Sequence, residues 1–149
     1  MSKLSHVDEE GRARMVDVSD KASTVRTAKA RGNLTCAPGS LAAVRAGATP
    51  KGAVIATAEL AAVMAAKRTA ELVPLCHPLP LTAIDVRIEI VDSLPGFRIH
   101  AEVRTKAGTG VEMEALTAVA IAGLTLFDML KAIDRTMVIG GIEVTSKTK

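Results

Sequence analysis

The chain has 149 residues, 48% of them hydrophobic, and a formal net charge of +3 at pH 7. This length and composition predict one globular domain with enough apolar chain to bury a core, and they exclude a disordered protein. The positive charge favours an anionic partner, either a nucleic acid or a phosphorylated small molecule. Single-stranded nucleic acids usually stack on aromatic side chains, so the absence of Trp and Tyr, with only two Phe, argues against a nucleic-acid partner.

The sequence predicts a cytoplasmic protein with no membrane segment and no metal site. It has no apolar N-terminal segment of the signal-peptide type, and the longest charge-free run in the strongest helical pattern, residues 115–127, is too short to cross a bilayer. Cys36 and Cys76 form no CxxC pattern, so we expect reduced thiols and neither a structural zinc nor a disulfide.

The first part of the chain divides into an arm and the start of a domain. Residues 1–13 are polar and irregular, which predicts a flexible arm, and residues 14–149 are predicted to form a single domain. Residues 23–36 predict a strand, and residues 39–46 a short helix that follows Pro38.

Thr49 and Pro50 predict the start of a longer helix that runs to Lys67, with Thr49 as the N-cap and Pro50 at the first helical position. Lys51 would then lie in the first helical turn, where free backbone amides and the helix dipole form a natural anion site. The alternative is a solvated surface lysine.

Cys76 and His77 lie between Pro74 and the pair Pro78 and Pro80. Each proline fixes φ and removes a backbone donor, so the segment is predicted to be a rigid extended connector that holds His77 in a defined place. The alternative is that both are ordinary half-buried residues before the next strand, because a free cysteine is usually a small buried hydrophobe.

Two segments alternate between apolar and charged residues, 84–90 and 97–104, and the loop of residues 92–96 joins them as a hairpin. A second long helix is predicted over residues 110–134, and a last strand over residues 137–145.

This order of elements predicts an α+β protein of the ferredoxin-like, split βαβ type, an antiparallel sheet with two main helices on one face. The fold hosts RNA-binding modules, ligand sensors and enzymes, so the function has to be argued from particular residues. The half-polar sheet and the Ala- and Gly-rich helices lead us to expect an oligomer.

The second long helix carries charged residues near both of its ends. Glu112 follows Thr109 by three residues, which is the spacing of a capping box. Asp128, Lys131 and Arg135 recur at helical spacing, which usually indicates surface ion pairs. In an otherwise apolar helix they also mark a polar corner where a desolvated lysine could act as a general acid or base.

Five motifs occur in order along the chain. They are residues 15–18 with 24–28, Lys51-Gly52, Leu75-Cys76-His77-Pro78-Leu79, Gly110-Val111-Glu112-Met113-Glu114-Ala115-Leu116, and Asp128-Met129-Leu130-Lys131-Ala132-Ile133-Asp134-Arg135. Together they resemble the cyclic pyranopterin monophosphate synthase family of molybdenum cofactor biosynthesis, over about residues 14 to 147.

The resemblance implies a lyase that converts 3′,8-cyclo-7,8-dihydro-GTP to cyclic pyranopterin monophosphate with release of pyrophosphate, so that residues 14–149 form a catalytic domain. It implies a homo-hexamer built as a trimer of dimers, with active sites at the dimer interfaces, and no cofactor. Whether Mg²⁺ accompanies the phosphates stays open.

The resemblance also places functional residues. Asp128 falls on the catalytic acid or base and Lys51 and Lys131 on the essential lysines, which agrees with the need for cations beside a departing pyrophosphate and for repeated proton transfers. The substrate contacts of the family fall on Leu75, Cys76, His77, Met113 and Glu114. Less certain members of the pocket fall on Glu112 and Arg26.

Glu114 and Asp128 are 14 residues apart on one predicted helix, which separates them by about 21 Å at 1.5 Å per residue. One small substrate cannot touch both from one helix, so we predict an active site shared by two chains across a two-fold interface.

Two points stay open at the level of sequence. The family usually continues into a Gly-Gly-Lys-Ser-Gly-like tail, which is either absent from the protein or missing from this sequence, and the candidates for a remaining phosphate-binding lysine of that region are Lys147 and Lys149. The alternative functions are an RNA-binding module and a non-catalytic purine-nucleotide-binding module of the same fold. Pyrophosphate release separates the enzyme from both.

Overall fold

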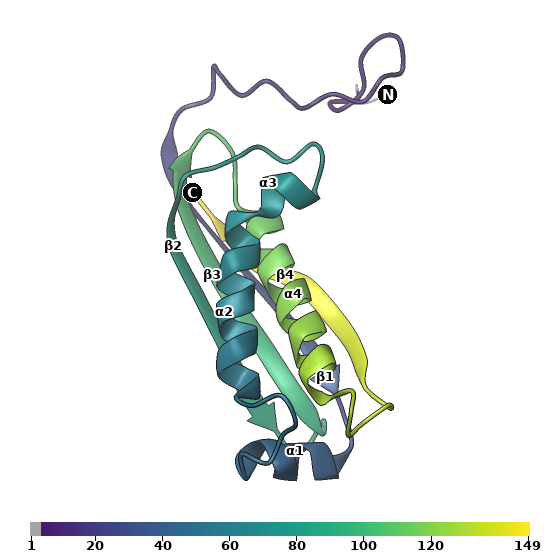
Figure 1. The fold of residues 1–149 in the computed structure, drawn as a ribbon. Helices are drawn as coiled ribbons and strands as arrows, with labels where there is room; N and C mark the ends of the chain where they lie inside the picture. The colour runs from purple at the N-terminus through teal and green to yellow at the C-terminus, as the bar shows by residue number, and fades with distance from the viewer. Residues whose placement is uncertain (1–3) are drawn as a thin grey trace.

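The computed structural model describes residues 4–149, which form a four-stranded antiparallel sheet in the order β2-β3-β1-β4. Figure 1 shows the two long helices, α2 and α4, side by side across one face of this sheet. The predicted α+β, ferredoxin-like fold is therefore confirmed. The elements are β1 (Thr24–Thr35), α1 (Pro38–Arg45), α2 (Val54–Lys67), α3 (Thr69–Leu72), β2 (Leu81–Val91), β3 (Gly96–Ala107), α4 (Glu112–Leu130) and β4 (Val138–Thr148).

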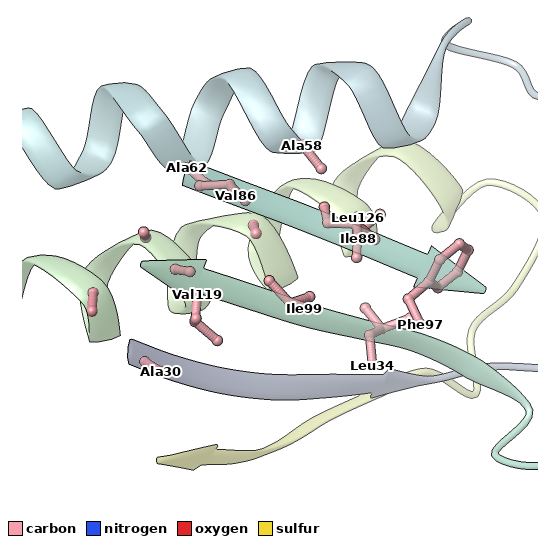
Figure 2. Close-up of a cluster of buried hydrophobic side chains, with 14 of the residues drawn as sticks. Ala30, Leu34, Ala58, Ala62, Val86, Ile88, Phe97, Ile99, Val119 and Leu126 are labelled. Atoms are coloured by element: carbon pink, nitrogen blue, oxygen red, sulfur yellow. The ribbon is translucent and has the colours of Figure 1, made fainter. Parts of the chain in front are cut away.

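The two faces of the sheet follow from the period-two pattern of its strands. In β3, Phe97, Ile99 and Val103 are fully buried beneath the helices, whereas His100 and Glu102 point to the opposite, partly exposed face. β3 lies between β1 and β2, so its buried side chains form the middle of the core. Figure 2 shows Phe97 and Ile99 enclosed between the sheet and the helices.

Small residues let the helices approach the sheet and each other closely. Ala58 and Ala62 of α2 are fully buried where α2 faces the sheet and α4 (Figure 2). Gly32 of β1 lies directly under α4, where an added Cβ would be only 2.7 Å from Val119 Cγ1. This packing fixes the position of α4, which carries predicted site residues at both of its ends.

The start of α2 differs from the prediction. The helix begins at Val54, because Gly52 has a φ of +92°, which is incompatible with a right-handed helix. Thr49 does not act as an N-cap, since its hydroxyl donates to the carbonyl of Gly52 (2.5 Å) within a turn. Lys51 therefore lies in this turn, and its predicted placement in the first turn of the helix is wrong.

The second long helix is shorter than predicted at both ends. It begins at Glu112 with Val111 as N-cap and no side-chain cap, so the capping box predicted from Thr109 and Glu112 is not formed. At the other end, Asp134 lies outside the helix because its carboxylate turns into the protein and accepts hydrogen bonds from Ala37, Ser40 and Thr136.

By length and apolar composition, α4 is the one helix among the described residues that could cross a membrane. More than half of its most apolar stretch is buried, and it packs on the sheet as the core helix. Residues 4–23 run above the end of the sheet where α4 begins (Figure 1) and include a short bridge between Val7 and Ala13. The predicted division into an arm of residues 1–13, whose first three residues lie outside the described part, and a domain of residues 14–149 stays a prediction.

Phe97→Ala is expected to lower the free energy of unfolding by about 3–5 kcal/mol, because it removes the largest fully buried side chain and leaves a cavity. Denaturant unfolding followed by circular dichroism measures the change. Ser93→Ala in the exposed hairpin loop is the control and should stay within about 0.5 kcal/mol of wild type. A loss for Phe97→Ala as small as that of the control would contradict this account of the core.

Candidate active site

The first group of predicted site residues lies at the C-terminal end of α4. Asp128 binds two lysines at once: its Oδ2 lies 2.9 Å from Lys51 Nζ and its Oδ1 lies 2.9 Å from Lys131 Nζ. Lys131 directly follows α4, and Lys51 comes from the turn before α2. The fold thus brings Lys51 to Asp128, 77 residues away in the sequence, beside the neighbouring Lys131.

The charges of this group define what it can do. The hydrogen bonds from Lys51 and Lys131 hold the pKa of Asp128 below its usual value, so the carboxylate is ionised at neutral pH. One carboxylate between two ammonium groups leaves an excess positive charge on an exposed surface. Such a group can bind an anion and can also exchange protons with it.

The second group surrounds a hollow of about 360 Å³ at the N-terminal end of α4. Its wall is built from three segments that are distant in sequence: residues that precede β1, the proline-rich connector before β2, and the loop that leads into α4 together with the first turn of that helix. The residues that line it are Ser5, His6, Val16, Val18, Lys21, Leu75, Cys76, His77, Leu79, Thr109, Gly110, Glu112 and Met113.

Hydrogen bonds hold the proline-rich connector, residues 74–80, in place near both of its ends. The backbone amide of Cys76 donates to the carbonyl of Val73 (3.1 Å), and the hydroxyl of Thr105 in β3 donates to the carbonyl of Pro80 (2.7 Å). His77 Nε2 contacts the carbonyl oxygen of Val16. Because a carbonyl can only accept, Nε2 donates, and Nδ1 is the ring nitrogen that remains for a ligand.

Cys76 is a thiol rather than a thiolate. Burial raises its pKa to about 11, and the nearby Glu114 carboxyl, with Oε1 3.6 Å from Sγ, acts in the same direction. A reactive cysteine has a lowered pKa and a cationic neighbour, whereas no cation among the residues that the structure describes acts on the pKa of Cys76. We therefore exclude Cys76 as a nucleophile at neutral pH.

Glu112 lies at the wall of the hollow and pairs with the end of β4. Lys147 Nζ is 3.1 Å from Glu112 Oε1, close enough for an ion pair although the two are not aligned for a hydrogen bond. Of the two C-terminal lysines left open by the sequence, Lys147 is thus the one that reaches the predicted site. Arg26 lies at the same end of the sheet, where its Nε donates to the carbonyl of Ala107 (3.1 Å).

Glu114 is placed differently from its neighbours. Its side chain is only 3% exposed, lies against Cys76, and does not line the hollow. Burial raises the pKa of its carboxyl group. The Glu114 side chain is therefore buried against Cys76, and its predicted contact with the substrate stays a prediction.

The two groups are not brought together within one chain. Glu114 and Asp128 lie on the same unbroken helix, 14 residues apart, which corresponds to about 21 Å along its axis. This agrees with the separation expected from the sequence. Each end of α4 carries only part of the predicted site.

Two residues that support the site were not singled out from the sequence. An added Cβ at Gly110 would overlap the Glu112 carboxylate, so this glycine makes room for it, and nothing in the sequence indicated this. In the sequence Asp134 stands out only as a member of the last of the five motifs. Its spacing to Thr136 was the available signal, because an Asp commonly binds the backbone two residues on, as it does here (2.8 Å).

Comparison with known proteins is consistent with these observations. Residues 15–149 match the MoaC family. The chain is 57% identical over 147 residues to the cyclic pyranopterin monophosphate synthase of Nostoc sp., covering 99% of this chain and 88% of that protein. Proteins of the same name from Methylobacterium sp. and Roseiflexus sp. are each 55% identical, covering 99% of this chain and 92% and 94% of their own lengths.

Alkylation of Cys76 by iodoacetamide is expected to accelerate up to pH 10 without a plateau, because only the thiolate reacts and its pKa is about 11. Mass spectrometry of the Cys76 peptide gives the rate at each pH, and circular dichroism checks that the fold persists. A small free thiol serves as the control and should plateau above its ordinary pKa of about 8.5. If the alkylation rate of Cys76 reaches a plateau by pH 9, the pKa of its thiol is not raised.

Proposed function

We propose, because the chain belongs to the MoaC family, that it is a lyase of molybdenum cofactor biosynthesis that converts 3′,8-cyclo-7,8-dihydro-GTP to cyclic pyranopterin monophosphate and pyrophosphate. The observation that carries the proposal is Asp128 held between Lys51 and Lys131. This is a group suited both to phosphate binding and to proton transfer.

The excess positive charge at the C-terminal end of α4 suits the phosphate part of the substrate. Negative charge grows on the departing pyrophosphate, and an ammonium group close to it lowers the energy of that step. Rebuilding a purine-derived ring into a pterin also requires proton transfers. Asp128 is the ionised base of the group, and Lys131 beside it is an acid of complementary charge.

The hollow at the N-terminal end of α4 suits the ring part of the substrate. His77 offers its Nδ1, and Glu112 offers a carboxylate whose charge is balanced by Lys147. Met113 and Leu75 add apolar wall, against which a planar ring can pack. Ring recognition at this end and phosphate binding at the other would fix the orientation of the substrate.

The separation of the two ends favours a site made by two chains. If α4 packs antiparallel on the α4 of a second copy, the start of each helix lies beside the end of the other. Two of the large apolar side chains of α4, Met113 and Leu124, are 39% and 56% exposed and are available for such a contact. The proposed assembly is the hexamer of the family resemblance, a trimer of these dimers.

The remaining features of the proposal follow the family. We propose a cytoplasmic enzyme that needs no organic cofactor and no resident metal. Activity assays with and without a chelator decide whether Mg²⁺ is needed with the substrate phosphates. The RNA-binding alternative finds no support on the open sheet face, where β3 presents polar and charged residues, such as His100 in hydrogen-bond contact with Glu89 (3.0 Å), rather than aromatics.

Lys51→Ala is expected to lower kcat/KM by about 100-fold or more while the fold stays intact, because it removes one of the two cations beside the departing pyrophosphate. The assay supplies the cyclic GTP-derived substrate and measures pyrophosphate and pterin product together. Lys29→Ala, on the opposite face of the sheet, is the matched control and should keep its activity. Wild-type protein that releases no pyrophosphate would refute the function, and an active Lys51→Ala protein would refute the role of Lys51.

Mixing two inactive variants tests the shared site. His77→Ala damages one end of α4 and Asp128→Asn the other, so a mixed dimer keeps one intact site out of two. Random subunit exchange should restore about a quarter of the wild-type activity, since half of the dimers are mixed. Mixed oligomers verified by mass spectrometry that remain inactive, with both variants folded, would show that each site lies within one chain.

A further inference from the structure

Asp134 is a buried carboxylate to which the proposed chemistry gives no part. It is 6% exposed and lies in the segment between α4 and β4, shortly after Lys131. Its Oδ2 accepts from the backbone amide of Ala37 (2.8 Å) and from the hydroxyl of Ser40 (2.8 Å). Its Oδ1 accepts from the amide (2.8 Å) and the hydroxyl (2.6 Å) of Thr136. A carboxylate has about four acceptor sites, so these donors fill them and leave none for a substrate.

The donors around Asp134 are all neutral groups. Burial raises the pKa of its carboxyl group, but the hydrogen bonds from Thr136, Ala37 and Ser40 outweigh burial and hold that pKa below its usual value. The N-terminus of α1 also favours the negative charge, because Ala37 is its N-cap residue. No side chain of its own caps α1, so Asp134 supplies the cap from 97 residues away in the sequence.

Little else holds α1 on the domain. Of its eight residues, only Ser40 and Leu41 are buried. At its other end an exposed ion pair joins Arg45 to Asp92 (2.7 Å), where water and salt screen the charges. The chain then leaves α1 and enters the turn that carries Lys51. The position of this turn therefore depends on how α1 is attached.

The same carboxylate holds the segment of Lys131. The helix α4 ends at Leu130, whose carbonyl accepts from the amide of Asp134 (3.0 Å), so the chain turns directly after the helix. The hydrogen bonds to Thr136 hold the chain that follows. Lys131 lies within this turn, reaches back to Asp128 (2.9 Å), and lines a hollow of about 440 Å³ together with Asp134.

We propose that Asp134 is a positioning residue that ties the segment of Lys51 to the segment of Lys131 and so sets where the two ammonium groups lie. The part of these lysines in catalysis rests on the proposed function. Both contact Asp128 at 2.9 Å, but on an exposed surface, where ion pairs alone fix geometry weakly. The hydrogen bonds of Asp134 are buried and involve an ionised acceptor, which makes them the stronger constraint.

NMR of lysine side chains labelled at Cε tests this link in the whole protein without a substrate. The variants Lys51→Arg and Lys131→Arg assign the two signals. Asp134→Ala should move both signals toward that of a solvated lysine, because the contacts with Asp128 loosen, while the signal of Lys29 on the opposite face of the sheet stays in place. Unchanged signals of Lys51 and Lys131 in a folded Asp134→Ala protein would overturn the inference whether or not the proposed activity is found.

A milder pair of variants decides the question if Asp134→Ala does not fold. Ser40→Ala removes only the hydroxyl on the α1 side of the link and should move the Lys51 signal. Thr69→Val is the matched control, because it removes an equally buried hydroxyl at the far end of α2 and should leave the signal in place. A Lys51 signal that is unchanged in Ser40→Ala, or that moves as much in Thr69→Val, would contradict the link.

Activity tests whether the link serves catalysis. Asp134→Ala is expected to lower kcat/KM by about tenfold or more, because even a small displacement of a positioned group slows the reaction. Asp134→Asn keeps one oxygen acceptor for Ala37 and Ser40 and should recover part of that loss.

A double-mutant cycle separates positioning from a general loss of structure. In a Lys51→Ala background, Asp134→Ala should lower kcat/KM by a smaller factor than in wild type, since one of the groups that it positions is gone. An equal factor in both backgrounds would show that Asp134 acts independently of Lys51 and that the positioning role is wrong. Wild-type protein without pyrophosphate release would instead refute the proposed function, and the NMR result would still decide the link.

Discussion

The length and rigidity of α4 are the constraint on which the rest of this structure depends. The helix runs without a break from Glu112 to Leu130, and its two ends carry the two groups of predicted site residues. A helix of this length cannot bend its ends together, so the groups stay about 21 Å apart in any single chain. The fold therefore determines that either the two groups serve different purposes or a second chain completes each of them.

The position of α4 is set by small residues rather than by large ones. Gly32 of β1 lets Val119 approach the sheet, and the alanines of α2 let the two helices pack side by side. The largest core side chain, Phe97, lies opposite Leu34 at the end of β1 that leads into α1. Close backbone packing leaves little freedom for the helix to slide. The spacing between its ends and the surrounding loops is correspondingly well defined.

The period-two strands, the proline-rich connector and the order of elements were predictable from the sequence, because each follows from local patterns of burial and backbone chemistry. The start of α2 was not, because Thr49 and Pro50 have the composition of a helix start, and only the positive φ of Gly52 shows that they form a turn. That turn moves Lys51 away from a helix dipole and onto Asp128, 77 residues away. Contacts of this kind depend on tertiary packing, which local patterns do not contain.

The buried state of Glu114 shows the same limit at the site itself. In the sequence, Glu112 and Glu114 are equivalent carboxylates in the first turn of a helix, where the dipole favours negative charge. Successive residues of a helix are rotated by about 100°, so the two side chains point in different directions. Glu112 points toward the end of β4, and Glu114 points toward the connector. Lys147 reaches only Glu112.

Asp134 shows the opposite pKa shift. Although burial raises its pKa, hydrogen bonds from Thr136, Ala37 and Ser40 hold that pKa well below its usual value. Burial raises the pKa of both carboxyl groups, that of Glu114 and that of Asp134, and the hydrogen-bond donors that the fold places around each one decide whether its pKa ends above or below the usual value.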